Sequence, residues 1–165
     1  MRKLVLFFAA LFMITTGISF ANDITDENYL SECRIGSLGL NDSFDMNQLN
    51  ETFGKMSKPA IQGGASTEPI VLFFDNARVV VINNDLYVID VTSNVGANGE
   101  PLKTPRGVSV GSDIDTVFRL YGAPYRIYKY QDEVSYSYGN YEHNLVFTTD
   151  PNNKIIEISA GRPTC

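Results

Sequence analysis

The chain has 165 residues, 44% of them hydrophobic and 19% charged, and a formal net charge of −6. It is too apolar to be an intrinsically disordered protein, and its length suits one domain or two very small ones. The acidic balance excludes binding to nucleic-acid phosphates and gives the chain no attraction to anionic lipid.

Residues 1–21 have the pattern of a secretory signal peptide. Two basic residues follow the first methionine, residues 4–18 are apolar, and the small residues Ser19 and Ala21 precede the expected cleavage site. The apolar run is shorter than the roughly 20 residues that span a bilayer, so we expect no membrane insertion after cleavage. The mature chain, residues 22–165, would carry 11 basic and 19 acidic residues, and we expect it in a periplasm or outside the cell.

Both cysteines, Cys33 and Cys165, lie in the mature chain. An even pair in an exported protein predicts a disulfide. The bridge would close a loop of about 130 residues and stabilise the fold by on the order of 4–5 kcal/mol. A redox site is not favoured, because the two residues lack the spacing of such motifs.

The first half of the mature chain, residues 33–91, predicts one helix followed by strands. The polar segment 22–32 before it is interpreted as a flexible arm with a helical turn near Tyr29, and residues 33–38 as a short strand. Asp42 or Ser43 can then cap a helix. The expected buried stripe of that helix is Met46, Leu49 and Phe53. The helix is expected to end at Gly54.

Residues 55–67 predict a loop, and three runs rich in β-branched and aromatic residues follow it. Asn and Asp residues separate these runs, which indicates tight hairpin turns and an antiparallel meander. The three expected strands are residues 70–74, 78–82 and 86–91.

The second half, residues 106–165, follows a linker at 92–105 and has the same order. Ser112 is a suitable N-cap, and Gly122 ends the expected helix. The stripe of that helix is Ile114, Val117 and Tyr121. The expected strands are residues 125–130, 134–138, 144–148 and 154–159.

Residues 40–54 and 108–122 align with an offset of 68 residues, so that Gly54 meets Gly122. Such self-similarity indicates an internal repeat. We therefore predict an α+β fold of two tandem repeats, each a short helix followed by an antiparallel meander of three to four strands. Whether the two meanders share one sheet stays open.

Residues 106–124, with an apolar-Gly start, a capped helix and a Gly-x-Pro ending, resemble a recurring unit of exported bacterial proteins. The unit is similar to that of the SmpA/OmlA-type outer-membrane assembly lipoproteins and of the tandem β-lactamase-inhibitor proteins. Residues 38–56 match the unit loosely, because Lys55-Met56 follows the glycine where the second copy has Ala123-Pro124. The resemblance implies a helical layer on an antiparallel sheet that binds another protein. It carries over no binding residues, and the missing lipobox cysteine counts against the lipoprotein role.

Catalytic chemistry has no clear place in this sequence. His143 is the only histidine, and no spacing of His or Cys residues predicts a zinc site. Asp45 and Asp113 occupy equivalent helix-start positions, where the helix dipole favours a carboxylate. The turns at 83–85 and 150–153 offer oxygen atoms but not the ligand spacing of an EF-hand. We expect no enzyme activity and no cofactor.

Seven of the nine tyrosines fall within residues 121–141. Alternate residues of a strand share a face, so two adjacent strands could place four phenol rings on one sheet face. Such a surface would recognise a partner, although cross-strand pairs that only stabilise the sheet are the alternative. The expected partner-binding residues are Tyr128, Tyr130, Tyr136, Tyr138 and Tyr141.

These observations predict a non-catalytic, exported protein-binding module of the bacterial envelope or extracellular space, whose partner is an envelope or secreted protein. One alternative is a small secreted hydrolase with two carboxylates facing one cleft, about 5–10 Å apart. Another is a structural envelope component without a specific ligand. The oligomeric state stays open.

Overall fold

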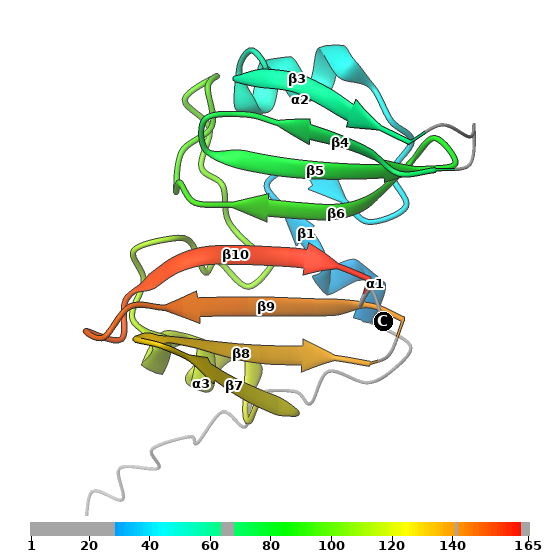
Figure 1. Cartoon of the computed structure of the whole chain (residues 1–165). Helices are drawn as coiled ribbons and strands as arrows, with labels where there is room; N and C mark the ends of the chain where they lie inside the picture. The colour runs from blue at the N-terminus through cyan, green and yellow to red at the C-terminus, as the bar shows by residue number, and fades with distance from the viewer. Residues whose placement is uncertain (1–28, 64–67, 141, 163–165) are drawn as a thin grey trace, which may run out of the picture.

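The computed structural model of the chain describes residues 29–63, 68–140 and 142–162 (Figure 1). The fold is α+β, with short helices and mostly antiparallel strands. In chain order, the elements are α1 (Tyr29–Glu32), β1 (Arg34–Ile35), β2 (Leu38–Gly39), α2 (Met46–Phe53), β3 (Lys58–Gln62), β4 (Ile70–Phe73), β5 (Ala77–Ile82), β6 (Asp85–Val91), α3 (Ile114–Tyr121), β7 (Arg126–Tyr130), β8 (Glu133–Gly139), β9 (Asn144–Thr149) and β10 (Ile155–Gly161).

Eight of these strands form one continuous sheet in the order β3-β4-β5-β6-β10-β9-β8-β7. Each half of the chain contributes a four-stranded antiparallel meander. The last strands of the two meanders pair antiparallel, with Ser159 on β10 opposite Asp90 on β6. This pairing of β6 with β10 is the seam between the two halves, and it answers the question that the sequence left open.

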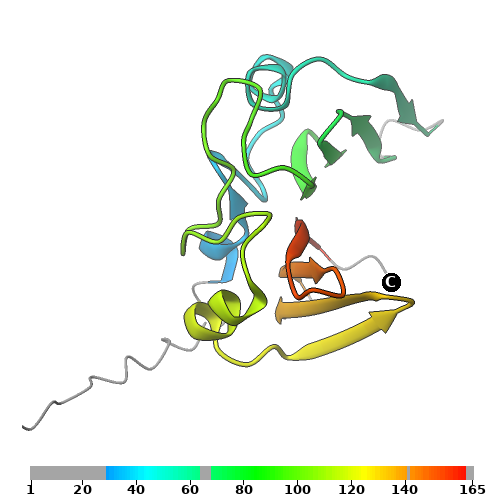
Figure 2. The same ribbon diagram turned by 90° about the vertical axis from the view of Figure 1, so that its left-hand side faces the viewer.

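The helices and the β1–β2 hairpin lie against one side of the sheet, as Figure 2 shows with the sheet nearly edge-on. The side chains on that side form the core, and many of them are fully buried. They include Val79, Ile89, Leu145, Phe147 and Ile158. No helix covers the opposite side in the described part of the chain, and we call that side the open face.

The two main helices begin at aspartates and end at glycines. The Asp45 side chain accepts a hydrogen bond from the Asn47 N–H at 2.8 Å and caps α2. The expected cap Asp42 instead accepts from the Gly39 N–H at 2.8 Å and pairs with Arg34 at 3.0 Å.

In α3 the N-cap is Asp113, without a side-chain capping bond. Its carboxylate pairs with Lys154 Nζ at 2.7 Å. The expected cap Ser112 is engaged elsewhere, since its hydroxyl accepts a hydrogen bond from the Ser109 N–H at 3.3 Å. The ends of both helices at Gly54 and Gly122 agree with the prediction, whereas the N-cap of each helix lies one to three residues later than predicted.

Two segments differ from the sequence expectation. Residues 33–38 do not form a single strand, because Gly36 turns the chain with φ +61° and makes the β1–β2 hairpin. The expected loop at 55–67 contains β3, which pairs with β4. The strands expected at 70–91 and 125–159 are confirmed with small shifts of their ends.

The end of the expected N-terminal arm is packed against the second half. Tyr29 is buried, and Glu32 pairs with Arg106 at 3.0 Å. The guanidinium of Arg106 also donates to the Leu120 carbonyl at 2.6 Å and lies 4.9 Å from the centre of the Tyr121 ring. The rest of the arm, residues 22–28, and the expected signal peptide lie outside the described residues.

A search of the described helices for one both long and apolar enough to cross a membrane finds none.

Candidate functional site

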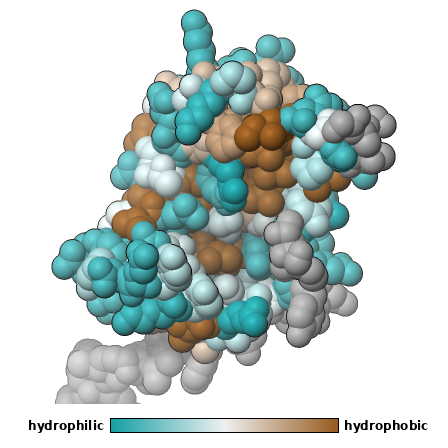
Figure 3. All heavy atoms as spheres, in the orientation of Figure 1, coloured by the Kyte–Doolittle hydropathy of each residue, from teal (hydrophilic) through white to brown (hydrophobic). Residues whose placement is uncertain are grey.

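The open face carries partly exposed apolar side chains at its centre. The register places Val71 on β4 opposite Val80 on β5, and Val80 opposite Val88 on β6. All three side chains are half-buried, as is Val146 on β9. Figure 3, which looks onto this face, shows hydrophobic residues gathered over the part formed by β4–β6 and mostly hydrophilic residues around them. The open face thus has an apolar centre and a polar border.

One row of side chains crosses five neighbouring strands of the open face. It consists of Lys58, Phe73, Arg78, Asp90 and Ser159, each directly opposite the next. The Lys58 Nζ atom lies 5.8 Å from the centre of the Phe73 ring, within the range of a cation–π contact. Each side chain of the row therefore has its partner on an adjacent strand.

Asp90 contacts both of its neighbours in this row, Arg78 and Ser159. Its Oδ2 atom accepts from Arg78 Nε at 2.6 Å and lies 2.5 Å from Arg78 Nη2. Its Oδ1 atom accepts from the Ser159 hydroxyl at 2.5 Å. The Asp90 side chain is only 8% exposed, while that of Arg78 is 54% exposed. Both carboxylate oxygens are thus satisfied, as a buried charge requires.

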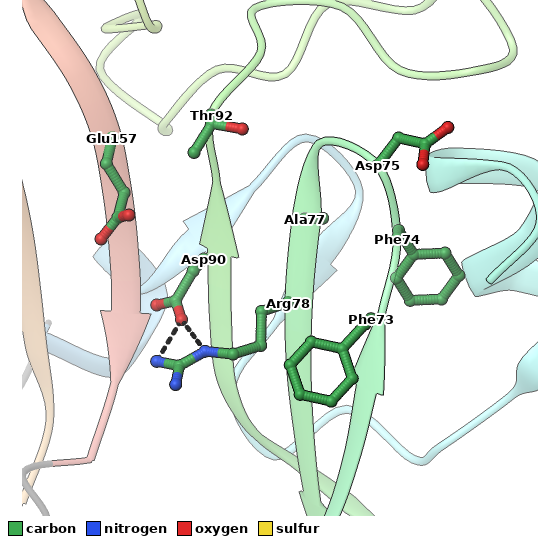
Figure 4. Close-up of a pocket in the computed structure, with 8 residues that line it drawn as sticks. All are labelled: Phe73, Phe74, Asp75, Ala77, Arg78, Asp90, Thr92 and Glu157. Atoms are coloured by element: carbon green, nitrogen blue, oxygen red, sulfur yellow. Dashed lines mark hydrogen bonds and ion pairs between the residues drawn. The ribbon is translucent and has the colours of Figure 1, made fainter. Parts of the chain in front are cut away.

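A pocket of about 460 Å³ opens beside this pair (Figure 4). Its lining comes from β4, β5 and β6 with the turn between β4 and β5, and from β10 across the seam. The lining residues are Phe73, Phe74, Asp75, Ala77, Arg78, Asp90, Thr92 and Glu157. The pocket joins two aromatic rings, an exposed guanidinium and three carboxyl groups.

Burial raises the pKa of Glu157, and the nearby Asp90 carboxylate adds to this effect. Arg78 acts in the opposite direction and lowers the pKa, while Glu133 raises it further. The pocket therefore favours a protonated Glu157 or a positively charged group beside it. Among the described residues, no group of three or more His, Cys, Asp or Glu side chains could hold a metal ion.

The predicted tyrosine surface is divided between the two sides of the sheet. Tyr128 pairs with Ser135 and Tyr136 pairs with Ile127, so Tyr128 and Tyr136 point to opposite sides. Tyr128 and Tyr130 lie on the open face and are 63% and 61% exposed. The expectation that four rings share one face was wrong, although each pair within a strand does share a face.

Tyr136 and Tyr138 lie on the covered side, against α3. The Tyr136 ring meets Phe118 edge-on at 5.3 Å, and Tyr138 packs against Tyr121 at 5.6 Å. The Tyr138 hydroxyl donates to the Gly122 carbonyl at 3.1 Å, and burial raises the pKa of this phenol. These two tyrosines anchor α3 to the sheet. Tyr141 lies outside the described residues.

The remaining candidates are structural in character. Cys33 is fully buried, and burial raises the pKa of its thiol to about 12. Its expected partner Cys165 lies outside the described residues, so the disulfide stays a prediction. His143 is half-buried, and its pKa is lowered by burial and by Arg162. The helix-start residues Asp45 and Asp113 are the N-cap residues of helices in different halves of the chain, so they are not placed in one site.

Sequence reasoning missed Arg78, Asp90 and Glu157. They lie on three strands, and no motif links them. Alternation within β5 and β6 places Arg78 and Asp90 on polar positions, but only the pairing of β6 with β10 brings Glu157 beside them.

No protein-family model matches this chain, and no curated protein sequence matches it. Among solved structures, the chain is similar to a DUF4309 family protein, YjgB, from Bacillus subtilis subsp. subtilis str. 168, at 14% identity and a TM-score of 0.45. That match covers 77% of this chain and 83% of the other. A second is an extracellular protein containing a SCP domain from Bacillus anthracis str. Ames, at 14% identity and a TM-score of 0.41. It covers 73% of this chain and 43% of that protein. The resemblance of residues 106–124 to the SmpA/OmlA-type and β-lactamase-inhibitor units stays a prediction.

Proposed function

We propose that the mature chain is a non-catalytic, exported protein-binding module that recognises a partner through the open face of its sheet. The observation that carries this proposal is the row of half-buried valines, Val71, Val80 and Val88, on a face that no described helix covers. Contiguous apolar surface of this kind marks interaction sites in proteins that are otherwise well packed.

The border of the open face has the composition of a protein interface. Tyr128 and Tyr130 supply large exposed rings on the edge strand β7, and Phe73 and Arg78 supply an aromatic ring and a guanidinium on β4 and β5, beside the valines. Tyrosine and arginine dominate the binding energy of many interfaces, because each combines contact area with hydrogen bonds. A partner that covers the valines would also contact Phe73 and Arg78 on the same strands.

The partner we expect is a folded envelope or secreted protein in a periplasm or outside the cell. The support for this location is the signal-peptide pattern of residues 1–21 and the acidic balance of the mature chain. A basic side chain of the partner would suit the pocket beside Asp90 and Glu157, where burial disfavours an unpaired Glu157 carboxylate.

A second candidate is a small hydrolase, favoured by three acidic side chains, Asp75, Asp90 and Glu157, that line one pocket. Figure 4 shows that Asp75 points away from the other two. A glycosidase needs one carboxyl group as a general acid and a second as a free carboxylate. Glu157 would suit the first role, since its pKa is raised. Asp90 is poorly suited to the second, because Arg78 and Ser159 already occupy its two oxygens. We therefore favour binding over hydrolysis.

We also propose that the two halves of the chain are tandem repeats of one helix-plus-meander unit. The support is their common element order, α2 before β3–β6 and α3 before β7–β10. The strand order of the sheet is symmetric about the seam, because the last strand of each meander lies there. The aligned glycines that end the helices, Gly54 and Gly122, share an unusual backbone conformation.

The experiment that tests the binding proposal compares two charge-neutral double variants of the mature chain. Val80→Lys with Val88→Glu places a cross-strand pair of opposite charges on the open face. Met56→Lys with Val95→Glu introduces the same two charges at exposed apolar residues in loops outside the sheet. Each variant is first shown to be folded by its circular dichroism and thermal unfolding. Capture of a saturable partner from envelope and secreted fractions should be lost only with the open-face variant.

A further inference from the structure

Strand β7 is a free edge of the eight-stranded sheet. No other described strand pairs with its outer side, and all five of its residues are exposed. Its apolar side chains lie on both sides of the sheet, with Ile127 at 60% exposure on the covered side and Tyr128 on the open face. Exposed edges with apolar side chains are templates for pairing with another chain.

The opposite edge of the sheet is less suited to pairing. Strand β3 contains Pro59, which lacks an N–H donor, and its register with β4 shifts between Lys58 and Ile61. Proline and irregular register are features that blunt an edge strand. Strand β7 contains no proline, and its register with β8 is regular from Arg126 to Tyr130.

The register of β7 decides which of its backbone groups face outward. Tyr130 and Glu133 flank a two-residue turn, and such a turn closes on a hydrogen-bonded pair. Hydrogen-bonded and non-hydrogen-bonded pairs alternate along an antiparallel ladder. Tyr128 and Arg126 therefore direct their N–H and C=O groups toward β8, while Ile127 and Lys129 direct theirs away from the sheet.

The start of the strand agrees with this alternation. The Tyr125 N–H donates to the Ser137 carbonyl at 3.0 Å, although Ser137 is already the partner of Arg126. Tyr125, directly before β7, and Arg126 thus both oppose Ser137 on β8, as in a β-bulge. Tyr125 is occupied by this bulge, which leaves Ile127 and Lys129 as the outward pair.

We propose that β7 pairs antiparallel with β7 of a second copy of this chain, about a two-fold axis at Tyr128. In this register, Ile127 of each copy lies opposite Lys129 of the other. Both residues direct their backbone groups outward, so the pairing forms four backbone hydrogen bonds. An interface of this kind is self-complementary, as a two-fold axis requires.

Neighbouring registers fit less well. A register centred on Ile127 would place Tyr125 opposite Lys129, and the bulge already uses the Tyr125 N–H. A register centred on Lys129 would place two lysines directly opposite each other, which is destabilising. The register centred on Tyr128 avoids both problems.

The side chains of the proposed register are also complementary. On the open face, Arg126 lies opposite Tyr130 of the second copy, where the guanidinium can stack on the ring. On the covered side, the Lys129 stem can lie along Ile127 of the second copy with its ammonium in water. The two copies of Tyr128 meet at the axis. The pairing extends the open face across both copies, but it does not depend on the binding function proposed above.

The first test measures self-association of the mature chain by sedimentation equilibrium, from millimolar to micromolar concentration. We expect a reversible monomer–dimer equilibrium. Lys129→Pro removes one outward N–H from each copy without removing a bond to β8, and we expect at least about a tenfold loss in the association constant. Lys129→Ala keeps the N–H and is the matched control, which should still dimerise. A monomeric parent at every concentration, or equal association of both variants, would overturn the proposal.

The second test needs no proline and locates the axis. Residues directly opposite in a non-hydrogen-bonded pair have Cα atoms about 4.5 Å apart, within the reach of a disulfide. Under mild oxidation, Tyr128→Cys should give a covalent dimer that the parent does not give. Tyr130→Cys introduces a thiol at a side chain of similar exposure, but far from its own symmetry mate. Cross-linking of both variants to the same extent would contradict the proposed register.

Discussion

Asp90 accepts a hydrogen bond from the Ser159 hydroxyl at 2.5 Å across the seam where β6 pairs with β10. The same carboxylate holds Arg78 on its other oxygen. One buried charge thus connects the two halves of the sheet and orients the guanidinium on the open face. The two meanders are joined by a polar contact on one side of the sheet and by apolar packing on the other.

Ser159→Ala should lower the free energy of unfolding by about 1.5–3 kcal/mol, because the Asp90 carboxylate loses a partner in a buried position. The matched control is Ser135→Ala, since the Ser135 hydroxyl bonds Thr148 at 3.0 Å within one half of the sheet. That bond is between neutral groups, and we expect its loss to cost about 0.5–1.5 kcal/mol. Denaturant unfolding measures both. A smaller loss in Ser159→Ala than in the control would contradict the importance of the seam contact.

The repeat proposal predicts equal sensitivity at the two helix ends. Gly54 has φ +86° and ψ −163°, and Gly122 has φ +77° and ψ −150°. This region is open almost only to glycine, so alanine at either position should destabilise the fold by about 1–3 kcal/mol. The thermal midpoints of Gly54→Ala and Gly122→Ala should fall together. If one substitution were neutral, the two helix ends would not be equivalent.

The raised pKa of Glu157 predicts that the stability of the fold depends on pH. Its pKa in the folded state is raised above the ordinary value of 4.5, mainly by burial. The folded state therefore binds the proton more tightly than the unfolded state, and stability falls as the pH rises from about 4.5 through the raised pKa. Glu157→Gln should remove this contribution. Relative to the parent, the variant should become more stable as the pH rises from acid to neutral; a constant difference between the two would contradict the raised pKa.

The two cysteines predict a disulfide, provided that the chain is exported as proposed. Mature protein prepared under oxidising conditions should have the mass of a chain lacking two hydrogen atoms and should show no thiol after unfolding without reductant. Reduction should then lower the free energy of unfolding by on the order of 4–5 kcal/mol. Two alkylated cysteines in the unfolded, unreduced protein would exclude the bridge. The burial of Cys33 requires that alkylation be measured after unfolding, because burial raises the pKa of this thiol to about 12.

Local sequence patterns predicted most of the fold. The runs around Val79 and Ile89 are dense in β-branched residues, and the stripe at Ile114 and Val117 has helical spacing, so both element types were evident. Strand β3 was missed because it contains Pro59 and all its residues are exposed, which leaves no alternation. It forms because β4 offers it a pairing edge.

The prediction that four tyrosines share one face of the sheet was wrong because of the register between β7 and β8. The two-residue turn between Tyr130 and Glu133 pairs even-numbered residues of β7 with odd-numbered residues of β8. Tyr128 and Tyr136 are both even-numbered, so they must lie on opposite sides. The spacing within each strand was correct, but the side that each strand presents depends on the turn.

The pocket could not be predicted from local patterns. Asp90 and Glu157 are 67 positions apart, and they meet only because β6 and β10 are neighbours in the sheet. That neighbourhood is a property of the whole topology. The open face has the same origin, since it exists only because both meanders place their helices on one side.

The most direct measurement of the central claim is the affinity of the captured partner for the parent and for the two double variants, at equal protein stability. We predict that Val80→Lys with Val88→Glu weakens binding at least about tenfold, because it removes the apolar centre that a partner would cover. Met56→Lys with Val95→Glu should bind like the parent. Unchanged affinity in the open-face variant, or equal weakening in both, would contradict recognition through the open face.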